Sequence, residues 1–256
     1  MSQRNAKIFG VDGKPIGELP VPTVFSAVLR KDMITKAVVA QESHRFQPQG
    51  RNAMAGKRTT AESFGVGRGI SRVPRIGGHG PLSGTAAFAP GTVGGRLAFA
   101  PVTLKKIAKS INRKERRSAL DSAIAATGSK DLVRLRGHRV DEDIELPLIV
   151  TDEVEKLAKS STAKTFLTAI GIWDDIDRVK KSKKIRGKGR KHSVGPLIIV
   201  SEYQGAQKAF QNFEGVEVIR VKDLNVSALA PGTHPGRLAV WTESAIKALS
   251  ERSWLR

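Results

Sequence analysis

The sequence predicts an α/β fold. We expect a mostly parallel sheet with helices on both faces, a Rossmann-like three-layer body, and a long extended basic loop. Three observations predict it. Short apolar runs alternate with helical segments from residue 132 onward. Several of these runs lack the polar alternation of half-exposed strands, which is typical of strands covered on both faces. Residues 44–101 show no hydrophobic periodicity at all. We therefore expect one globular domain over 1–256, with 44–101 as an inserted arm and 178–192 as a basic loop.

The N-terminal third predicts a strand, a turn and a helix in that order. Residues 7–9 favour a short strand, and residues 11–15 combine Asp, Gly and Pro in a turn. Apolar residues recur with helical spacing over 23–40, and Asp32 is placed to interrupt and recap that helix.

Two helices are predicted after the arm. Thr103 is placed as the N-cap of the first, whose apolar stripe is Leu104, Ile107, Ala108 and Ile111. Asn112, with Glu115 three residues on, is typical of a capping box that opens a second helix, and Gly128 would end it.

The remainder predicts alternating strands and helices. The strands are expected at 132–135, 146–150, 197–200, 216–221 and 238–241. The helices are expected at about 152–159, 163–170, 174–182, 204–211 and 242–251.

The net charge of +20 is concentrated in three stretches. Residues 44–101 carry twelve glycines, five prolines, eight cations and one acid, Glu62. Residues 102–127 carry seven cations and two acids, and residues 178–192 carry nine cations and no acid. The rest of the chain is close to neutral. Such a distribution indicates a polyanionic partner, because arginine forks fit phosphate oxygens and glycine lets backbone approach closely.

Composition excludes several classes of function. Cysteine is absent, which excludes disulfide scaffolds and thiolate metal sites. The first ten residues lack an apolar signal core, no run approaches the ~20 apolar residues of a membrane span, and the basic stretches lack an apolar face for a membrane surface. We expect no metal, no cofactor, no membrane partner and no catalytic centre.

Two cationic features predict phosphate binding, each against a plainer interpretation. The helix opening near Asn112 has four cations in its first turn, where they oppose the helix dipole unless phosphates lie there; the plainer interpretation is a surface that tolerates them. The run 178–192 would repel itself as a free loop; the plainer interpretation is a targeting signal or a flexible tail. Its ends are held by a predicted helix and a predicted strand, which favours phosphate neutralisation.

Other polar clusters favour structural interpretations. Gly65–Gly69 lacks the G-x-G-x-x-G spacing and the flanking strand and helix of a dinucleotide site. Asp174, Asp175 and Asp177 fit the dipole at a helix N-terminus better than a metal site, and 141–143 indicate a solvated turn. The five histidines are scattered without metal-ligand spacing.

Five stretches together resemble one family, the large-subunit ribosomal protein L-four family in its archaeal and eukaryotic form. They are GRGISRVPR at 67–75, GGRLAFAP at 94–101, RSALDSAIAAT at 117–127, ELPLIV at 145–150, and LAPGTHPGRL at 229–238 followed by WTESA at 241–245. The resemblance runs from about residue 8 to 250. The chain stops at Arg256 without the long basic extension of eukaryotic relatives, which indicates the shorter archaeal type.

The resemblance implies a structural protein of the large ribosomal subunit, not an enzyme. It implies an α/β body on the outside of the subunit and an arm that reaches through ribosomal RNA to the nascent-chain exit tunnel. The implied partners are ribosomal RNA, neighbouring large-subunit proteins and the nascent polypeptide, with one copy per ribosome in the cytoplasm. By motif position the tip lies at Arg75, Ile76, Gly77, Gly78, His79 and Gly80. Relatives often have a tip richer in glycine and arginine than Pro81–Ser83.

The expected RNA-binding residues are the cations of the three basic stretches. They are Arg45, Arg51, Lys57, Arg58, Arg68, Arg72, Arg75, Arg96, Lys105, Lys106, Lys109, Arg113, Lys114, Arg116, Arg117, Lys180, Lys181, Lys183, Lys184, Arg186, Lys188, Arg190 and Lys191. Two alternatives stay open: an RNA-modifying enzyme on a doubly wound fold, with a cofactor crevice at the carboxyl ends of the strands, and a free RNA chaperone or regulator.

Overall fold

The computed structural model describes residues 4–142, 144–187 and 189–251. The chain divides into two compact units. We call residues 1–44 and 109–256 the body, and Arg45–Ala108 the inserted segment. No helix in the described ranges has the length and apolarity needed to cross a membrane.

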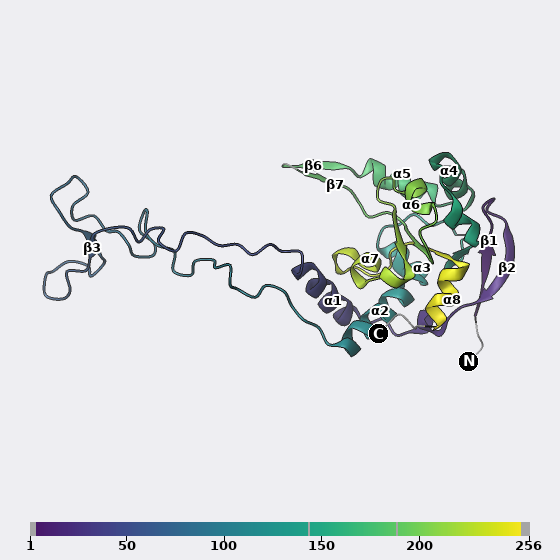
Figure 1. Cartoon of the computed structure of the whole chain (residues 1–256), viewed down its shortest axis with the longest axis horizontal. Helices are drawn as coiled ribbons and strands as arrows, with labels where there is room; N and C mark the ends of the chain where they lie inside the picture. Colours follow the sequence, from purple (N-terminus) through teal and green to yellow (C-terminus); the bar gives the residue numbers. More distant parts are fainter. Residues whose placement is uncertain (1–3, 143, 188, 252–256) are drawn as a thin grey trace. The chain divides into compact units, whose positions relative to one another are not determined.

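The body is built on a six-stranded sheet, drawn in Figure 1. Its strand order is β2-β1-β5-β10-β8-β9, and every neighbouring pair is parallel except β1 with β2. The bounds are β1 Asn5–Phe9, β2 Pro15–Pro20, β5 Leu148–Val150, β8 Leu197–Val200, β9 Glu217–Arg220 and β10 Ala239–Thr242. The predicted mixed α/β class with a mostly parallel sheet is confirmed.

The central strands are apolar without alternation because both of their faces are buried. Ile149 and Trp241 point into one core cluster, whereas Leu148 and Val240 point into a second cluster on the opposite face. β5, β8 and β10 are fully buried along their lengths. A strand buried on both faces needs no polar side, and this explains the continuous apolar runs.

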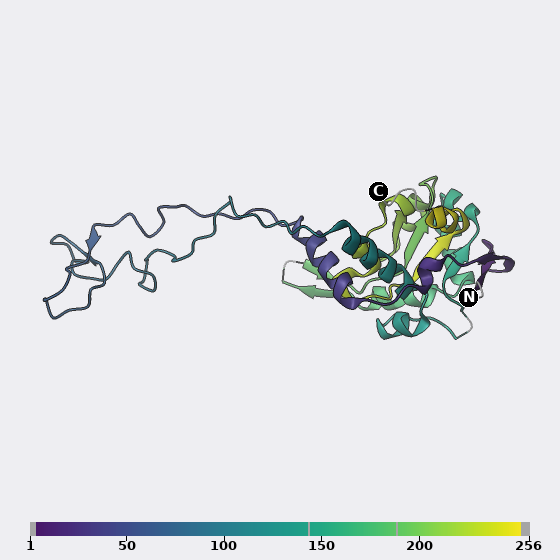
Figure 2. The same cartoon turned by 90° about the horizontal axis from the view of Figure 1, so that it is seen from below.

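Helices supply the rest of both clusters. In Figure 1, α4, α5 and α6 lie on one side of the sheet, and α1, α2 and α8 lie on the other; Figure 2 shows α1 and α2 side by side. The α-helices are α1 Lys31–Ser43, α2 Arg113–Thr127, α3 Lys130–Leu135, α4 Ser160–Ala169, α5 Trp173–Lys181, α6 Ala206–Phe210, α7 Val226–Leu229 and α8 Glu243–Glu251. The 3-10 helices are η1 Thr23–Ser26, η2 Asp152–Lys156, η3 Val221–Asp223 and η4 Pro231–Thr233.

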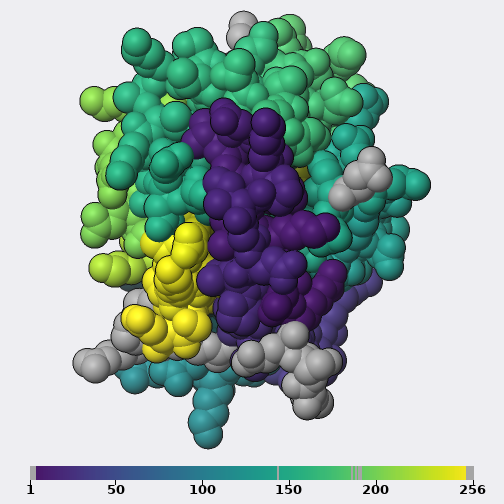
Figure 3. All heavy atoms as spheres, turned by 90° about the vertical axis from the view of Figure 1, so that its right-hand side faces the viewer, coloured from purple at the N-terminus to yellow at the C-terminus, as the bar shows by residue number. Residues whose placement is uncertain are grey.

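The edge of the sheet at β2 is open. β2 is exposed along most of its length, and Figure 3 shows the β1–β2 hairpin on the surface beside α8. The sequence carries no clear signal of β2. Its residues Pro15 and Pro20 cannot donate to a ladder, so they are tolerated only at such an edge.

Several element predictions hold. The strands at 7–9, 146–150, 197–200, 216–221 and 238–241 match β1, β5, β8, β9 and β10, and the helices at 163–170, 174–182, 204–211 and 242–251 match α4, α5, α6 and α8. The turn after β1 is present as well. The helix predicted over 23–40 is split into η1 and α1, and its second part begins at Lys31.

Other predictions are wrong for physical reasons. Residues 132–135 belong to the helix α3, because only Val133 of that run faces a core. Residues 101–112 form no helix; Leu104, the first residue of the predicted stripe, is almost fully exposed and finds no apolar partner. The predicted helix over 152–159 is the shorter 3-10 helix η2.

The predicted capping box at α2 is half formed. Asn112 occupies the N-cap position, but its side chain accepts no hydrogen bond from the helix. Glu115 accepts from Lys36 Nζ on α1 at 2.7 Å. The bond from Lys36 lowers the pKa of Glu115, and a hydrogen bond from the Asn112 backbone lowers it further, so the carboxylate joins two helices of the body and also reaches back to the start of its own helix.

The inserted segment has no core of its own. Every one of its residues is exposed or half-buried. Its regular structure consists of β3 Ala61–Glu62 and β4 Arg75–Ile76, which pair antiparallel, and a bridge between Arg75 and Ala86. Two loops leave this pairing: one is closed where Ser63 Oγ donates to the Arg72 carbonyl, and the other where Gly84 N donates to the Ile76 carbonyl.

The backbone of the inserted segment approaches itself closely at two glycines that leave no room for side chains. A Cβ placed on Gly56 would lie 2.4 Å from the Gly95 carbonyl oxygen. One on Gly95 would lie 2.2 Å from the Ala89 carbonyl oxygen. Gly56 also has a φ of +74°, which L side chains rarely adopt. Glycine thus permits close backbone approach at these two positions, whereas a Cβ on eight other glycines of the segment would meet nothing within 4 Å.

Candidate nucleic-acid interface

The cationic side chains of the inserted segment are mostly exposed, and the segment itself does not neutralise their charge. Most of the predicted ones are exposed; Arg75 and Arg96 are half-buried. Arg68 lies over the Phe64 ring and Arg96 over the Phe88 ring, each 5.6 Å from the centroid. These contacts hold the guanidinium groups while leaving their charge uncompensated.

Arg75 differs from the other predicted cations. Its Nη1 donates to the Gly84 carbonyl at 2.8 Å, and its Nε is buried without a partner among the described residues. The side chain therefore closes the loop that contains the predicted tip residues Gly77, Gly78 and His79. Within that loop Ser83 Oγ donates to the Gly78 carbonyl. Arg75 acts here as an internal tie, which sequence reasoning did not predict.

At the start of α2 the cations are exposed to solvent, whereas the acid is not. Arg113, Lys114 and Arg116 are exposed, while Glu115 is half-buried against Lys36 of α1. The exposed cations stand at the helix end where they oppose the dipole, at a cost of ~0.3–1 kcal/mol each. A bound anion at this end would reverse the sign of that interaction.

The run 178–192 is not a loop throughout. Its first residues complete α5, and β6 Lys184–Arg186 and β7 Gly189–Lys191 pair as an antiparallel hairpin. Lys180, Lys181, Lys183 and Lys184 are exposed. Lys188 lies outside the described residues, and so do the side chains of Arg186, Arg190 and Lys191.

Few of these cations have acidic partners within the protein. Lys183 pairs with Glu214 at 2.7 Å. Apart from Lys183 and Arg117, none of the predicted cations whose side chain is described forms an ion pair with another described residue. The basic stretches thus keep charge available for an external polyanion, as expected of a nucleic-acid interface.

The carboxyl ends of the central strands, where doubly wound folds bind cofactors, are closed by a buried carboxylate. Glu155 of η2 is 2% exposed. Its carboxylate accepts from Ser201 N just past β8 at 2.6 Å and from Thr242 Oγ1 at the end of β10 at 2.7 Å. Its own carbonyl accepts from Gly205 N. The Glu155 side chain thus lies at the strand ends where the enzyme alternative would need to place a cofactor phosphate.

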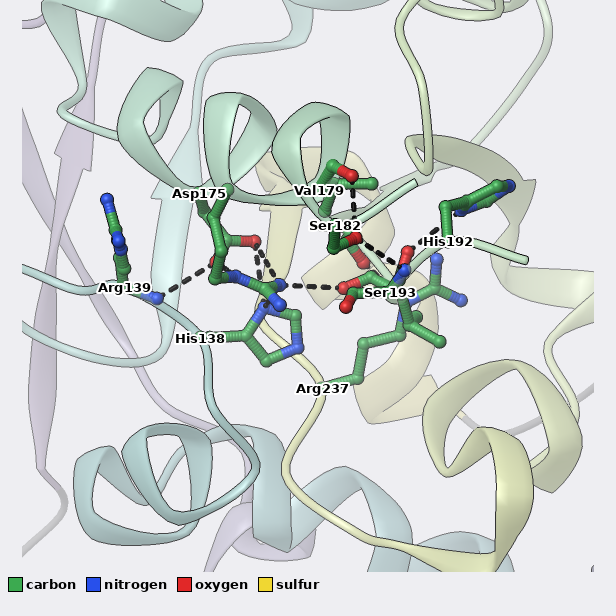
Figure 4. A network of polar contacts seen from close by, with 11 residues as sticks. His138, Arg139, Asp175, Val179, Ser182, His192, Ser193 and Arg237 are labelled. Carbon is green, nitrogen blue, oxygen red and sulfur yellow. Dashed lines mark hydrogen bonds and ion pairs between the residues drawn. The ribbon is translucent and has the colours of Figure 1, made fainter. Parts of the chain in front are cut away.

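At the opposite side of the body lies a polar network that sequence reasoning missed (Figure 4). His138 Nδ1 donates to Asp175 Oδ2 at 2.8 Å, and Arg139 N donates to Asp175 Oδ1 at 2.9 Å. Arg178 Nε donates to Asp175 Oδ1 at 2.8 Å, and its Nη2 to the Val194 carbonyl. Asp175 is fully buried, so the expectation that it merely complements a helix dipole was incomplete.

Electrostatics fixes the protonation of this network. Burial raises the pKa of Asp175, but hydrogen bonds from His138 and Arg178 outweigh it, and the pKa stays below the ordinary 3.8. Burial lowers the pKa of His138 below 6.5, against the pull of Asp175. At neutral pH a neutral imidazole therefore donates to an ionised carboxylate. Only the fold brings 138 and 175 together, so no sequence spacing signals the pair.

The described residues contain no group of three His, Asp or Glu side chains that could hold a metal ion. Fold and site together define the class: a basic α/β protein whose predicted cations are mostly exposed.

Comparison with known proteins identifies the family to which this basic α/β protein belongs. The model of the ribosomal protein L4/L1 family matches residues 19–252. The large ribosomal subunit protein uL4 of Saccharolobus solfataricus is 46% identical over 258 residues, covering 98% of this chain and 95% of that protein. The protein of the same name from Saccharolobus islandicus strain L.S.2.15 is 45% identical with the same coverage. The chain belongs to the ribosomal protein L4/L1 family, and the resemblance drawn from its motifs is confirmed.

Proposed function

We propose that the chain is a structural component of the large ribosomal subunit and not an enzyme. It binds ribosomal RNA through its three basic stretches, contacts neighbouring large-subunit proteins, and is present as one copy per ribosome in the cytoplasm. Its support is a family match over most of the chain, together with exposed cations, of which those other than Lys183 and Arg117 form no ion pair with another described residue.

The predicted arm 44–101, which makes up most of the inserted segment Arg45–Ala108, serves in this proposal as an RNA-penetrating arm. The observation that carries it is that the segment has no buried residue although it contains large apolar side chains. Phe99 and Leu104 are almost fully exposed. A segment of this composition cannot offset its ordering entropy by its own burial, so its surroundings must supply the contacts. Ribosomal RNA supplies both phosphates for the arginines and base faces for the apolar residues.

The loop closed by Arg75 is proposed as the arm tip in the exit tunnel, close to the nascent polypeptide. The tie from Arg75 to Gly84 supports a defined loop shape at 75–85. The body is proposed to be a Rossmann-like three-layer unit, supported by the two core clusters on opposite faces of the sheet.

Sedimentation tests this function. The protein should travel with large subunits through a high-salt wash, at one copy per subunit. A protein that sediments alone would contradict the proposal and favour a free RNA chaperone. The enzyme alternative would require a nucleotide or methyl donor in the purified protein, and the buried Glu155 argues against such a ligand.

A further inference from the structure

A cavity in the body lies at the amino ends of two central strands. Residues 192–194 lead into β8 and residues 231–235 lead into β10, and both stretches line a cavity of about 710 Å³. This is the opposite end of the strands from Glu155. The volume lies within the ~300–1,000 Å³ typical of ligand sites.

The lining of this cavity is cationic. Lys31, Arg136 and Arg178 contribute permanent charges, and three of the five histidines, His138, His192 and His234, line it as well. No carboxylate is among its lining residues. Asp175, behind the wall, compensates Arg178, so the charges of Lys31 and Arg136 are left without an acidic partner in the described body.

The Arg136 guanidinium at this cavity is buried with only part of its hydrogen-bonding capacity used. Its Nη2 donates to the Pro231 carbonyl at 2.8 Å, while its Nη1 is buried with no partner among the described residues. Burial, and then the charges of Arg237 and Arg178, lower the pKa of Arg136 to about 10, so it stays charged at neutral pH. The buried Nη1 donor of Arg136 would normally have a partner, and an anion in the cavity would supply one.

Apart from the hydroxyl residues Thr35, Ser193 and Thr233, the remaining lining is apolar and suits a flat ring. Leu132, Leu135, Pro231 and Pro235 surround the cationic groups, and Leu135 is 78% exposed although it is aliphatic. A phosphate next to a nucleobase combines the two chemistries that this lining matches. An acidic peptide would use the cations but not the apolar surfaces.

We propose that this cavity binds one nucleotide of RNA, with its phosphate against Arg136 and Lys31 and its base against the leucine and proline side chains. The inference rests on the proposed function, since it takes RNA as the partner. It adds a site on the body, at residues outside the three basic stretches except for Arg178 and His192.

Histidine signals in the full-length protein provide a local test. His138, His192 and His234 line the cavity, whereas His44 and His79 do not. Titration of ¹⁵N-histidine-labelled protein with the trinucleotide UUU should shift the three cavity imidazoles saturably, at lower concentration than the other two. Inorganic phosphate should shift them more weakly, because it lacks the base.

Two variants and a matched control sharpen the test. Arg136→Met should weaken UUU binding at the cavity histidines by roughly ten- to hundredfold, since a charged hydrogen bond is lost. Lys31→Ala, at an exposed position, should weaken it by roughly three- to tenfold. Lys208→Ala removes the same charge from an exposed position of α6 outside the cavity and should leave binding unchanged. If Arg136→Met does not fold, as judged by circular dichroism, Lys31→Ala decides.

Four results would overturn the proposal. The cavity histidines could ignore UUU, inorganic phosphate could bind as well as UUU, hexaglutamate could saturate them at lower concentration than UUU, or Lys31→Ala and Lys208→Ala could weaken binding equally. Each leaves the sedimentation test of the proposed function standing. Failure to sediment with large subunits, in contrast, would count against the function whatever the cavity binds.

Discussion

Ile198 and Val93 are both β-branched aliphatic residues, yet the first is fully buried and the second fully exposed. Ile198 belongs to the body, where each central strand is covered by helices on both faces. Val93 belongs to the inserted segment, where no residue is buried. Aliphatic side chains thus have two roles. In the body they stabilise the core, and in the inserted segment they are available to a partner.

Removal of the inserted segment should give the largest contrast between the two regions. Its ends meet in the body: Lys109 N donates to Ser43 Oγ at 2.9 Å, and His44 Nε2 lies 3.2 Å from the Lys109 carbonyl oxygen. A short glycine-serine linker in place of 45–108 should leave the body folded, with a melting temperature changed by only a few degrees. The same variant should be lost from large subunits in a high-salt wash, as measured by sedimentation. Unfolding of the variant would show that the body depends on the segment.

Truncation of one aliphatic residue in each region should give the next largest contrast. Leu167→Ala in α4 empties part of a core cluster and should reduce the free energy of unfolding by ~2–5 kcal/mol. Val93→Ala should change it by less than ~0.5 kcal/mol. Urea unfolding followed by circular dichroism measures both values. Equal losses would mean that the segment has a core of its own.

Acid should destabilise the body through His138. Because the folded protein lowers the pKa of His138 below 6.5, its contribution to stability is complete above 6.5 and is lost as the pH falls through the folded pKa. The slope can reach ~1.4 kcal/mol per pH unit. Asp175, whose pKa is also lowered, adds to the loss only nearer its ordinary 3.8.

The variant His138→Asn isolates this term, because an asparagine amide can still donate to Asp175 but does not titrate. Its free energy of unfolding should vary less than that of the wild type between pH 6.5 and 5. If the free energy of unfolding varies equally with pH in the two proteins, protonation of His138 is not the cause of the acid destabilisation.

Single cations of the inserted segment should give the smallest effect. Lys57→Ala should reduce the log–log salt slope of RNA binding by ~0.7–0.9, the contribution of one phosphate contact. Lys156→Ala, an exposed lysine of the body outside the three basic stretches, serves as the control and should leave the slope unchanged. Equal changes would mean that the protein binds RNA by its net charge and not through the segment.

The sequence predicted the parts of the fold that depend on local burial. Leu197–Val200 is apolar throughout, and it forms a strand with the predicted bounds. The predicted helix at 103–111 fails because helical periodicity signals a helix only where a core exists to receive the apolar stripe, and Leu104 meets none. The run 132–135 was too short for periodicity to separate helix from strand.

The candidate site likewise has features that the sequence predicts and features that depend on the tertiary fold. Exposed cations can be predicted from runs of lysine and arginine, since charge in a run needs no tertiary contact to be displayed. The pairing of His138 with Asp175 and the closure of the strand ends by Glu155 join residues that are distant in the chain. Only the strand order brings such residues together, so spacing in the sequence carries no signal of them.

Hydrogen exchange on the free protein and on the assembled large subunit tests the central contrast most directly. We expect the amides of β5, β8 and β10 to be protected in both states, and those of 45–108 to exchange rapidly in the free protein and slowly in the subunit. If the amides of 45–108 were protected as strongly in the free protein as in the subunit, the account would be contradicted, because the segment would then be ordered without a partner.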